Sequence, residues 1–497
     1  MKITVDSRGC GEGKTTLGIY PLIRRYQALN ELTLLVVPSH KLQDEYQIEF
    51  QNEITIIRGH GAVLALYEAL ENKLTSVICI TEECWRRSDI NQKYKQQFNL
   101  IIDEAINPFR SVAYDRKKSQ FDWTTIFQMN LTELQRFDEL NYYPFTIDES
   151  AIDNWTQSSE AIKRLTDKNY TSEMSAKTYD KLKNGVVIGR AEIFQQLKIE
   201  MIENWRSVHI AAAAFEYTMM NAWLNFHKKS YRITHEFNTR ELPVKFHFIE
   251  GLNWSKKKQL DPAFAPIKEE YKNYVNEYCS SRNKRPLALR NKISNTILEN
   301  EQKINHNPHG WNQFRDFTAI SLESALNPTA EFKKWLEFRI GMAEKQVTRA
   351  FSAYLFYQCI MRTCLRNQGN TTEVDVFCID EKTLSQIFLF ITPIKFSHAA
   401  VAISTNNIPS SYVKKIPKIP MTSTERSRKR RLKQKETTSN EEVERASNLR
   451  VASVITTNPI SDVPKQKVTY RAFNNILLPN PILAIKNMII NSLGKII

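Results

Sequence analysis

The sequence predicts an α/β protein, and three observations lead to this fold class. Residues 1 to about 110 alternate short apolar runs with amphipathic stretches, the pattern of a parallel sheet with helices on both faces. A second α/β segment begins near Val208, and further apolar runs follow between about 244 and 395. At 497 residues the chain is long enough for about two or three domains.

The apolar runs mark the expected strands in chain order. They are Ile3–Val5, Leu34–Val37, Ile54–Ile57, Val77–Ile80 and Leu100–Ile102, and later "VKFHFI", "PLALR", "FTAISL" and "VDVFCI". Residues from about 110 to 205 are rich in Lys, Glu and Gln and predict a largely helical insertion. After about 405, prolines, Ser/Thr and blocks of like charge predict a disordered basic tail.

The charge balance points to a polyanionic partner. The formal net charge is +15 and the pI is near 9.3, a balance typical of proteins that bind nucleic acid. Ten Lys/Arg and one Glu lie between Lys414 and Lys435, so much of the excess belongs to the tail. That segment is read equally as a nucleic-acid contact, a solvated tail or a localisation signal.

Cysteine usage and hydropathy point to a cytosol-like compartment. The seven cysteines form no Cys-x-x-Cys pair, which favours reduced thiols over disulfides or zinc. The chain has no run of about 18 apolar residues, and it opens with a strand and a glycine loop. We therefore expect neither a membrane span nor a signal peptide, and a cytoplasmic location (the host cytoplasm for a viral protein).

The stretch "SRGCGEGKTT" (Ser7–Thr16) predicts a phosphate-binding loop between a strand and a helix. Its candidate nucleotide-binding residues are Gly9, Gly11, Gly13, Lys14, Thr15 and Thr16. Glycines let backbone N–H groups approach phosphate oxygens, the lysine contacts the β/γ-phosphates, and the Thr15 hydroxyl is a ligand for Mg²⁺. The expected ligands are thus ATP and Mg²⁺. The first glycine of the usual pattern is displaced, because Arg8 stands there. Pro21 predicts a kinked or short helix after the loop.

The stretch "FNLIIDEA" (Phe98–Ala105) supplies the carboxylates that a nucleotide hydrolase needs. Asp103 and Glu104 follow a buried strand, at the edge where the sites of parallel sheets lie. Asp103 is predicted to hold Mg²⁺ and Glu104 to polarise the attacking water. An Asp-Glu pair in an ordinary surface turn is the alternative.

Together these motifs resemble superfamily 2 helicases of the DEAD/DEAH-box type, most closely the helicase-like proteins of phages and mobile elements. The acidic pair resembles the family's DEAx box. Five further stretches follow in the family's order: "TLLVVPSHKL" (33–42), "CITEE" (79–83), "AAAAFEYT" (211–218), "HNPHGWNQF" (306–314) and "YQCIMRTCLR" (357–366). The resemblance implies two RecA-like domains, with Gln358, Arg362 and Arg366 reaching across a cleft to the γ-phosphate. If helical, the two arginines share one face; surface arginines in helix salt bridges are the alternative.

Four features depart from the family pattern. Met361 stands where a glycine precedes the first arginine, and Arg366 lies one place late. The segment between the acidic box and "AAAAFEYT" is much longer than in a minimal family member, and "AAAAFEYT" lacks the usual Ser. Thr218 and Glu216 are accordingly read either as coupling residues or as an ordinary core strand and its exit. His306 and His309 are read as part of a loop near phosphate or nucleic acid, or as a plain turn, in preference to zinc ligands.

The resulting prediction has three parts: a RecA-like domain 1–238 with the insertion at about 110–205, a RecA-like domain 239–404, and a tail 405–497. The predicted activity is ATP-dependent unwinding of, or movement on, nucleic acid, DNA rather than RNA, in replication or recombination of a phage or mobile element, with replication proteins as possible partners. The alternatives are a terminase-type packaging ATPase, whose nuclease carboxylates would have to include Asp375 and Asp380, and a nucleic-acid-binding scaffold without turnover.

Overall fold

A computed structural model gives the fold of most of the first 403 residues. It describes residues 2–115, 142–145, 167–184, 186, 190–249, 252, 254–291, 297–304, 306, 313–367, 369–393 and 400–403. The predicted basic tail, including the segment between Lys414 and Lys435, lies outside the described residues.

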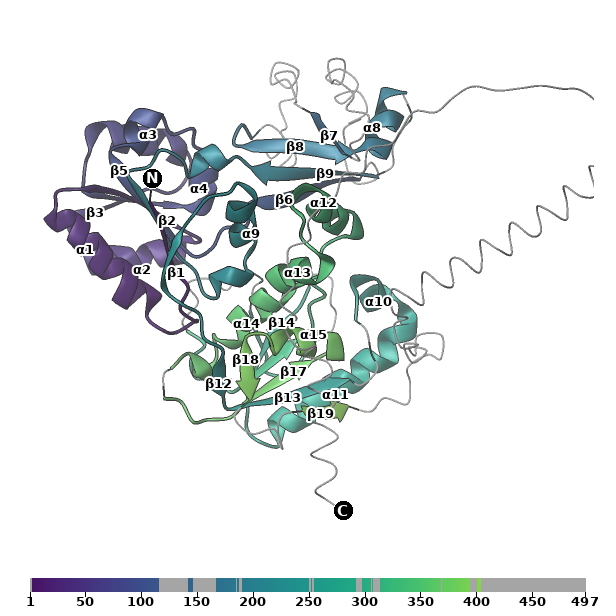
Figure 1. Ribbon diagram of the computed structural model, residues 1–497. Coiled ribbons are helices and arrows are strands. Elements are labelled where there is room, and N and C mark those ends of the chain that lie inside the picture. The colour runs from purple at the N-terminus through teal and green to yellow at the C-terminus, as the bar shows by residue number, and fades with distance from the viewer. Residues whose placement is uncertain are drawn as a thin grey trace, which may run out of the picture. The chain divides into compact units, whose positions relative to one another are not determined.

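The first lobe is built on a seven-stranded parallel sheet of order β11-β1-β10-β5-β2-β4-β3 (Figure 1). Its strands are β1 (Ile3–Asp6), β2 (Leu32–Val37), β3 (Ile54–Ile56), β4 (Val77–Thr81), β5 (Phe98–Asp103), β10 (Ser207–Ala211) and β11 (Arg232–His235). Its main helices are α1 (Tyr20–Ala28), α2 (His40–Phe50), α3 (Ala62–Asn72), α4 (Glu82–Arg87) and α9 (Met219–Phe226). Each of the five apolar runs predicted before residue 110 falls on one of these strands.

Both faces of this sheet are buried, which explains why its strands read as continuous apolar runs. Leu35, Val37 and Ile101 pack with residues of α1 and α2 on one face. Leu34 and Val36 pack with residues of α3, α4 and α9 on the other. Because all strands are parallel, their carboxyl ends lie along one edge, and the loops that follow β1 and β5 meet there.

The second lobe is built on a six-stranded parallel sheet of order β15-β14-β16-β17-β13-β19. Its strands are β13 (Val244–Ile249), β14 (Pro286–Leu289), β15 (Gln302–Lys303), β16 (Ala319–Leu322), β17 (Val374–Cys378) and β19 (Ala400–Ile403). Its helices include α11 (Ala265–Ser280), α14 (Tyr354–Ile360) and α15 (Glu381–Ile387), and β12 (Arg240–Leu242) pairs separately with β18 (Ile391–Pro393). Two parallel α/β sheets confirm the predicted fold class.

The insertion was predicted to be largely helical, but the part of it that the structure describes is mainly a β-sheet. There the chain forms an antiparallel sheet of order β6-β9-β8-β7, with one helix, α8 (Ala176–Lys183). The strands are β6 (Phe109–Asp115), β7 (Tyr142–Phe145), β8 (Tyr170–Ser175) and β9 (Arg190–Leu197). Several polar side chains of these strands are buried, among them Glu173, Gln195 and Gln196, and this polar content gave the segment the composition of a solvated helix.

A helix that follows the second lobe's β16 packs onto this insertion sheet. The helix is α12 (Ala330–Ile340), and its Trp335 ring stacks on Phe194 of β9 with centroids 5.4 Å apart. Trp335 Nε1 also donates a hydrogen bond to the buried Glu173 carboxylate at 2.7 Å. Residues between Phe332 and Ala350 therefore share a core with the first lobe, and Figure 1 shows α12 beside the insertion sheet. The next helical segments, α13 (Glu344–Thr348) and a π-helical segment Arg349–Ala353, lead into α14.

Candidate nucleotide site

The glycine loop after β1 has the backbone that the sequence predicts for it. Gly11 and Gly13 have φ values of +81° and +78°, in the left-handed region that glycine occupies without strain. The following helix opens with a π-helical turn, Lys14–Ile19, before α1 begins. Pro21 lies in the first turn of α1, directly after this π-helical turn, and the residue before α1, Ile19, is itself helical. The helix is therefore irregular just before the proline.

Arg8, which replaces the usual first glycine, belongs to a buried ion pair behind the loop. Its guanidinium contacts Asp6, with Nε 2.9 Å from Oδ1, and the Asp6 side chain is only 2% exposed. Burial alone would raise the pKa of Asp6, but the hydrogen bonds and charge of Arg8 hold this pKa below its ordinary value. The arginine therefore anchors the base of the loop to the end of β1.

Lys14 and Thr15 lie on the side of the loop that faces a cavity of about 290 Å³. The Lys14 ammonium is buried and donates to the carbonyl oxygens of Arg8 and Gly9 at 3.2 and 3.1 Å. The Thr15 hydroxyl lies 3.4 Å from Asp103 Oδ2. A cation and a hydroxyl thus face the cavity from the helix N-terminus, where an anion is favoured.

The acidic pair closes the floor of the same cavity. Asp103 is buried at the end of β5, and Tyr46 of α2 donates a hydrogen bond to it at 2.8 Å. Burial and the charge of Glu104 raise the pKa of Asp103 to about 7, although Tyr46, Lys14 and Thr15 act in the opposite direction. A bound divalent cation would relieve this unfavourable charge, so the Asp103 carboxylate and the Thr15 hydroxyl fit Mg²⁺, a cation that prefers oxygen ligands.

Glu104 sits on a strained backbone. Its φ is +88°, a conformation that L-residues rarely adopt, and its N–H donates to the carbonyl of Ala211 at 2.8 Å. Strain of this kind persists where surrounding structure enforces it, most often at functional sites. The turn brings Glu104 Oε2 within 3.4 Å of Gln358 Nε2, from the second lobe.

The second lobe supplies the cations on the opposite wall. Arg362 and Arg366 both line the cavity, as does Asn367. Burial, followed by the charge of Arg362, lowers the pKa of Arg366 from its ordinary value, which indicates that the two guanidinium groups are close. They do not share a helix face, however: α14 ends at Ile360, and Arg366 lies in a separate 3₁₀ turn.

Besides Asn367, three residues that contribute to the site were not predicted from the sequence. Arg315, in the loop before β16, also lines the cavity, and it comes from an element remote in sequence from the two arginines. Tyr46 contacts Asp103, and the hydroxyl of Tyr357 accepts a hydrogen bond from the Cys10 N–H at 2.9 Å. Only Tyr357 carried a sequence signal, because it stands directly before Gln358.

His306 does not line the cavity. His306 Nε2 is 2.9 Å from the Ser324 hydroxyl, while Pro308, His309 and Gly310 lie outside the described residues. No group of three or more His, Cys, Asp or Glu side chains able to hold a metal occurs among the residues that the structure describes.

The "AAAAFEYT" stretch contacts the start of the loop. The Ser7 hydroxyl donates to Glu216 at 2.6 Å and accepts from the Phe215 N–H at 2.9 Å. Thr218 caps the N-terminus of α9 by accepting from the Asn221 N–H. The first of these contacts places Glu216 next to the phosphate loop, whereas Thr218 has a local structural role.

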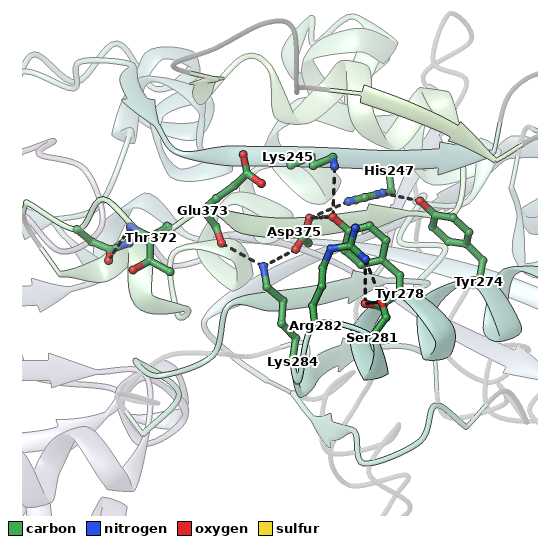
Figure 2. Close-up of polar contacts among 11 residues, drawn as sticks. Lys245, His247, Tyr274, Tyr278, Ser281, Arg282, Lys284, Thr372, Glu373 and Asp375 are labelled. Atoms are coloured by element: carbon green, nitrogen blue, oxygen red, sulfur yellow. Dashed lines mark hydrogen bonds and ion pairs between the residues drawn. The ribbon is translucent and has the colours of Figure 1, made fainter.

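The two carboxylates considered for a nuclease are engaged in structural contacts. Asp375 of β17 is buried, and Figure 2 shows His247, Tyr278 and Lys284 converging on it. His247 Nε2 lies 2.9 Å from Asp375 Oδ1, and Tyr278 donates to the same oxygen at 3.0 Å. Asp380, beyond the other end of β17, caps α15 through the Thr383 N–H. The two aspartates therefore form no paired metal site.

In the described part of the chain, no helix combines the length and the apolar character needed to span a bilayer.

Comparison with known proteins finds similarity at the level of whole structures only. The sequence matches no family model, and it matches no curated protein. An apo XPD structure is similar with a TM-score of 0.47 at 11% identity, covering 81% of this chain and 97% of that one. Xpd4 from S. tokodaii has a TM-score of 0.44 at 11% identity, covering 81% and 96%. The DEAD-box helicase Mss116, bound to ssRNA and UDP-BeF, has a TM-score of 0.37 at 8% identity, covering 83% and 72%. Similarities this distant do not assign the chain to a family.

Proposed function

We propose that this protein hydrolyses ATP in the cavity between its two lobes and uses the reaction to unwind, or move along, nucleic acid. One observation carries the proposal. A phosphate-type loop and an acidic pair from the first lobe face Arg362 and Arg366 of the second lobe across one cavity, and Gln358 of the second lobe lies 3.4 Å from Glu104.

Each group has a role that its surroundings favour. Lys14, at the helix N-terminus, would bind the terminal phosphates. Thr15 and Asp103 would hold Mg²⁺, which neutralises charge on the phosphate oxygens. Glu104 would accept the proton of the attacking water, and the Gln358 amide, 3.4 Å away, would fix the orientation of that carboxylate.

The arginines of the second lobe would neutralise the charge that develops on the transferred phosphoryl group. Because the catalytic set is divided between two lobes, its geometry depends on how the lobes are held. Binding of nucleic acid across both lobes would therefore change the rate of hydrolysis. The net charge of +15 favours such a polyanionic partner, and we expect DNA rather than RNA.

Steady-state ATP hydrolysis, measured with and without single-stranded DNA, tests the proposal. We expect turnover that the DNA stimulates, and we expect Lys14→Ala to reduce it at least about a hundredfold because phosphate contacts are lost. Lys93→Ala is the matched control, since Lys93 pairs with Glu71 on the surface. Unchanged turnover in Lys14→Ala would show that the site is wrong. DNA binding without any turnover in the wild type would favour the scaffold alternative, and metal-dependent cleavage of plasmid DNA the terminase alternative.

The setting in which the activity works rests on the sequence resemblance alone. We propose a replication or recombination role in a phage or mobile element, acting in the cytoplasm.

A further inference from the structure

The tip of the phosphate loop is buried in the second lobe. Cys10 is 4% exposed and packs in the same apolar core as Ile360 and Met361. Its backbone N–H donates to the Tyr357 hydroxyl at 2.9 Å, and the Tyr357 side chain is itself fully buried. The loop therefore contacts the second lobe directly through its backbone, apart from any contact that a nucleotide would mediate.

This contact gives a steric reason for the glycines at two positions of the loop. A Cβ on Gly11 would lie 2.6 Å from the carbonyl oxygen of Arg366, a distance that no real Cβ tolerates. A Cβ on Gly9 would lie 3.0 Å from the Tyr357 hydroxyl and 2.9 Å from a carboxylate oxygen of Glu12. Gly9 does not have a positive φ, so its backbone conformation does not require glycine. A Cβ there would displace the Glu12 side chain and press on the Tyr357 hydroxyl.

Tyr357 is held rigidly by the second lobe. Its ring stacks on Phe390 with centroids 5.2 Å apart and meets Phe237 edge-on at 5.9 Å. The Tyr357 residue also precedes Gln358 on α14, so the hydroxyl and the amide that reaches Glu104 move as one unit. Displacement of the second lobe would therefore break the contact with Cys10 and the contact with Glu104 together.

We propose that Tyr357 is a positioning residue that fixes the phosphate loop in its catalytic shape only when the second lobe is closed on it. The inference rests on the proposed function and adds a residue to it. Nucleotide binding to the first lobe would not need this contact, whereas hydrolysis would. Removing the hydroxyl leaves a buried N–H of Cys10 without a partner in the closed arrangement and so disfavours that arrangement.

The test separates binding from chemistry in Tyr357→Phe, which keeps the ring stacking. Affinity is measured with fluorescent N-methylanthraniloyl-ADP and Mg²⁺, and chemistry as single-turnover hydrolysis of ATP. We expect affinity within about twofold of wild type and a hydrolysis rate about tenfold lower. Tyr26→Phe removes a hydroxyl that contacts Ser207 in the first lobe, and as the control it should change neither quantity. A rate within twofold of wild type, or an equal loss of affinity and rate, would overturn the proposal.

A second variant approaches the same contact from the loop. Gly9→Ala should also slow hydrolysis, because its Cβ would lie 3.0 Å from the Tyr357 hydroxyl. Combined with Tyr357→Phe, the loss should be close to that of the more damaging single change, since both act on one contact. If the reductions in hydrolysis rate of the two single variants multiply in the double variant, the contact between Gly9 and Tyr357 is not the cause of the slower hydrolysis. The proposed function is tested separately, by turnover of the wild type and its loss in Lys14→Ala. Both results can be obtained even if Tyr357→Phe hydrolyses ATP at the wild-type rate, in which case only the role of Tyr357 is refuted.

Discussion

Gly11 shows at the scale of one residue how closely the loop is constrained. Its φ of +81° already disfavours any side chain, and the carbonyl oxygen of Arg366 occupies the space where a Cβ would lie. Gly59 has a similar φ of +86°, but nothing lies within 4 Å of its Cβ position. The two glycines therefore share a left-handed backbone conformation and differ in one contact, which makes them a matched pair.

Replacing each by alanine separates strain from contact. Both variants should lose about 1–2 kcal/mol of unfolding free energy from the left-handed backbone. Gly11→Ala should in addition lose ATP hydrolysis by at least tenfold, because the second lobe cannot approach the loop. Gly59→Ala should keep wild-type turnover. Chemical denaturation and an ATPase assay measure the two effects, and equal turnover in both variants would argue against the contact.

Individual residues also show where sequence reasoning stopped. Gly11, Lys14 and Asp103 were found because each lies in a short motif whose spacing is set by local backbone geometry. Tyr46 and Arg315 were missed because their partners come from elements distant in the chain, and no local pattern marks a side chain that points into a cavity formed by folding.

At the scale of secondary-structure elements, a buried polar network ties α11 to the second sheet. Asp375 of β17 receives hydrogen bonds from His247 of β13 and Tyr278 of α11 (Figure 2). Lys284, which follows the helix, pairs with the other carboxylate oxygen at 2.5 Å. Burial alone would raise the pKa of Asp375, but the hydrogen bonds from His247 and Lys284, with the charge of Lys284, hold it below its ordinary value.

This network predicts an acid-sensitive second lobe. Because the folded-state pKa of Asp375 lies below the unfolded value, its stabilisation is present at neutral pH and is lost as pH falls through the carboxyl range toward the folded value. Asp375→Asn should lower the free energy of unfolding by about 3 kcal/mol at pH 7, since it breaks a buried pair. The difference from wild type should shrink below pH 4. Urea titrations at both pH values measure it, and a pH-independent difference would contradict the assignment.

Elements differ in how far their sequences predicted them. The parallel strands were predicted correctly, because a strand buried on both faces is a continuous apolar run in the sequence. The strands β8 and β9 of the insertion did not, because their buried faces carry Glu173, Gln195 and Gln196, whose partners come from other segments. Composition cannot distinguish a polar side chain satisfied inside a sheet from one that faces water.

At the scale of the whole molecule, the chain returns from the second lobe to the first through α12. Besides its hydrogen bond from Trp335, Glu173 lies 3.4 Å from the Arg339 guanidinium, and the Thr329 hydroxyl donates to Glu192 of β9. From α12 the helical run continues to Gln358. The insertion sheet is thus connected through packed helices to the cavity wall that carries the arginines, a physical route by which events at the insertion could reach the site.

Trp335→Phe tests how much the contact between α12 and the insertion sheet contributes to stability. The ring stacking is largely kept, but Glu173 loses its 2.7 Å donor, and we expect the free energy of unfolding to fall by about 1–3 kcal/mol. Hydrogen exchange should become faster in β8 and α12 and stay unchanged in β1. Lys334→Ala, at an exposed position of the same helix where the lysine pairs with Glu331, should have little effect. Uniformly faster exchange throughout the chain would show that the contact between α12 and the insertion sheet does not open independently of the rest of the protein.

The central claim is that one ATP site is shared by the two lobes, and Arg362→Ala tests it most directly. Nucleotide affinity and single-turnover ATP hydrolysis are measured together for wild type, Lys14→Ala and Arg362→Ala. The account predicts that Lys14→Ala loses both affinity and hydrolysis, whereas Arg362→Ala keeps its affinity within a few-fold and loses hydrolysis by about a hundredfold or more. Hydrolysis at the wild-type rate in Arg362→Ala would contradict it, because the first lobe would then be acting alone.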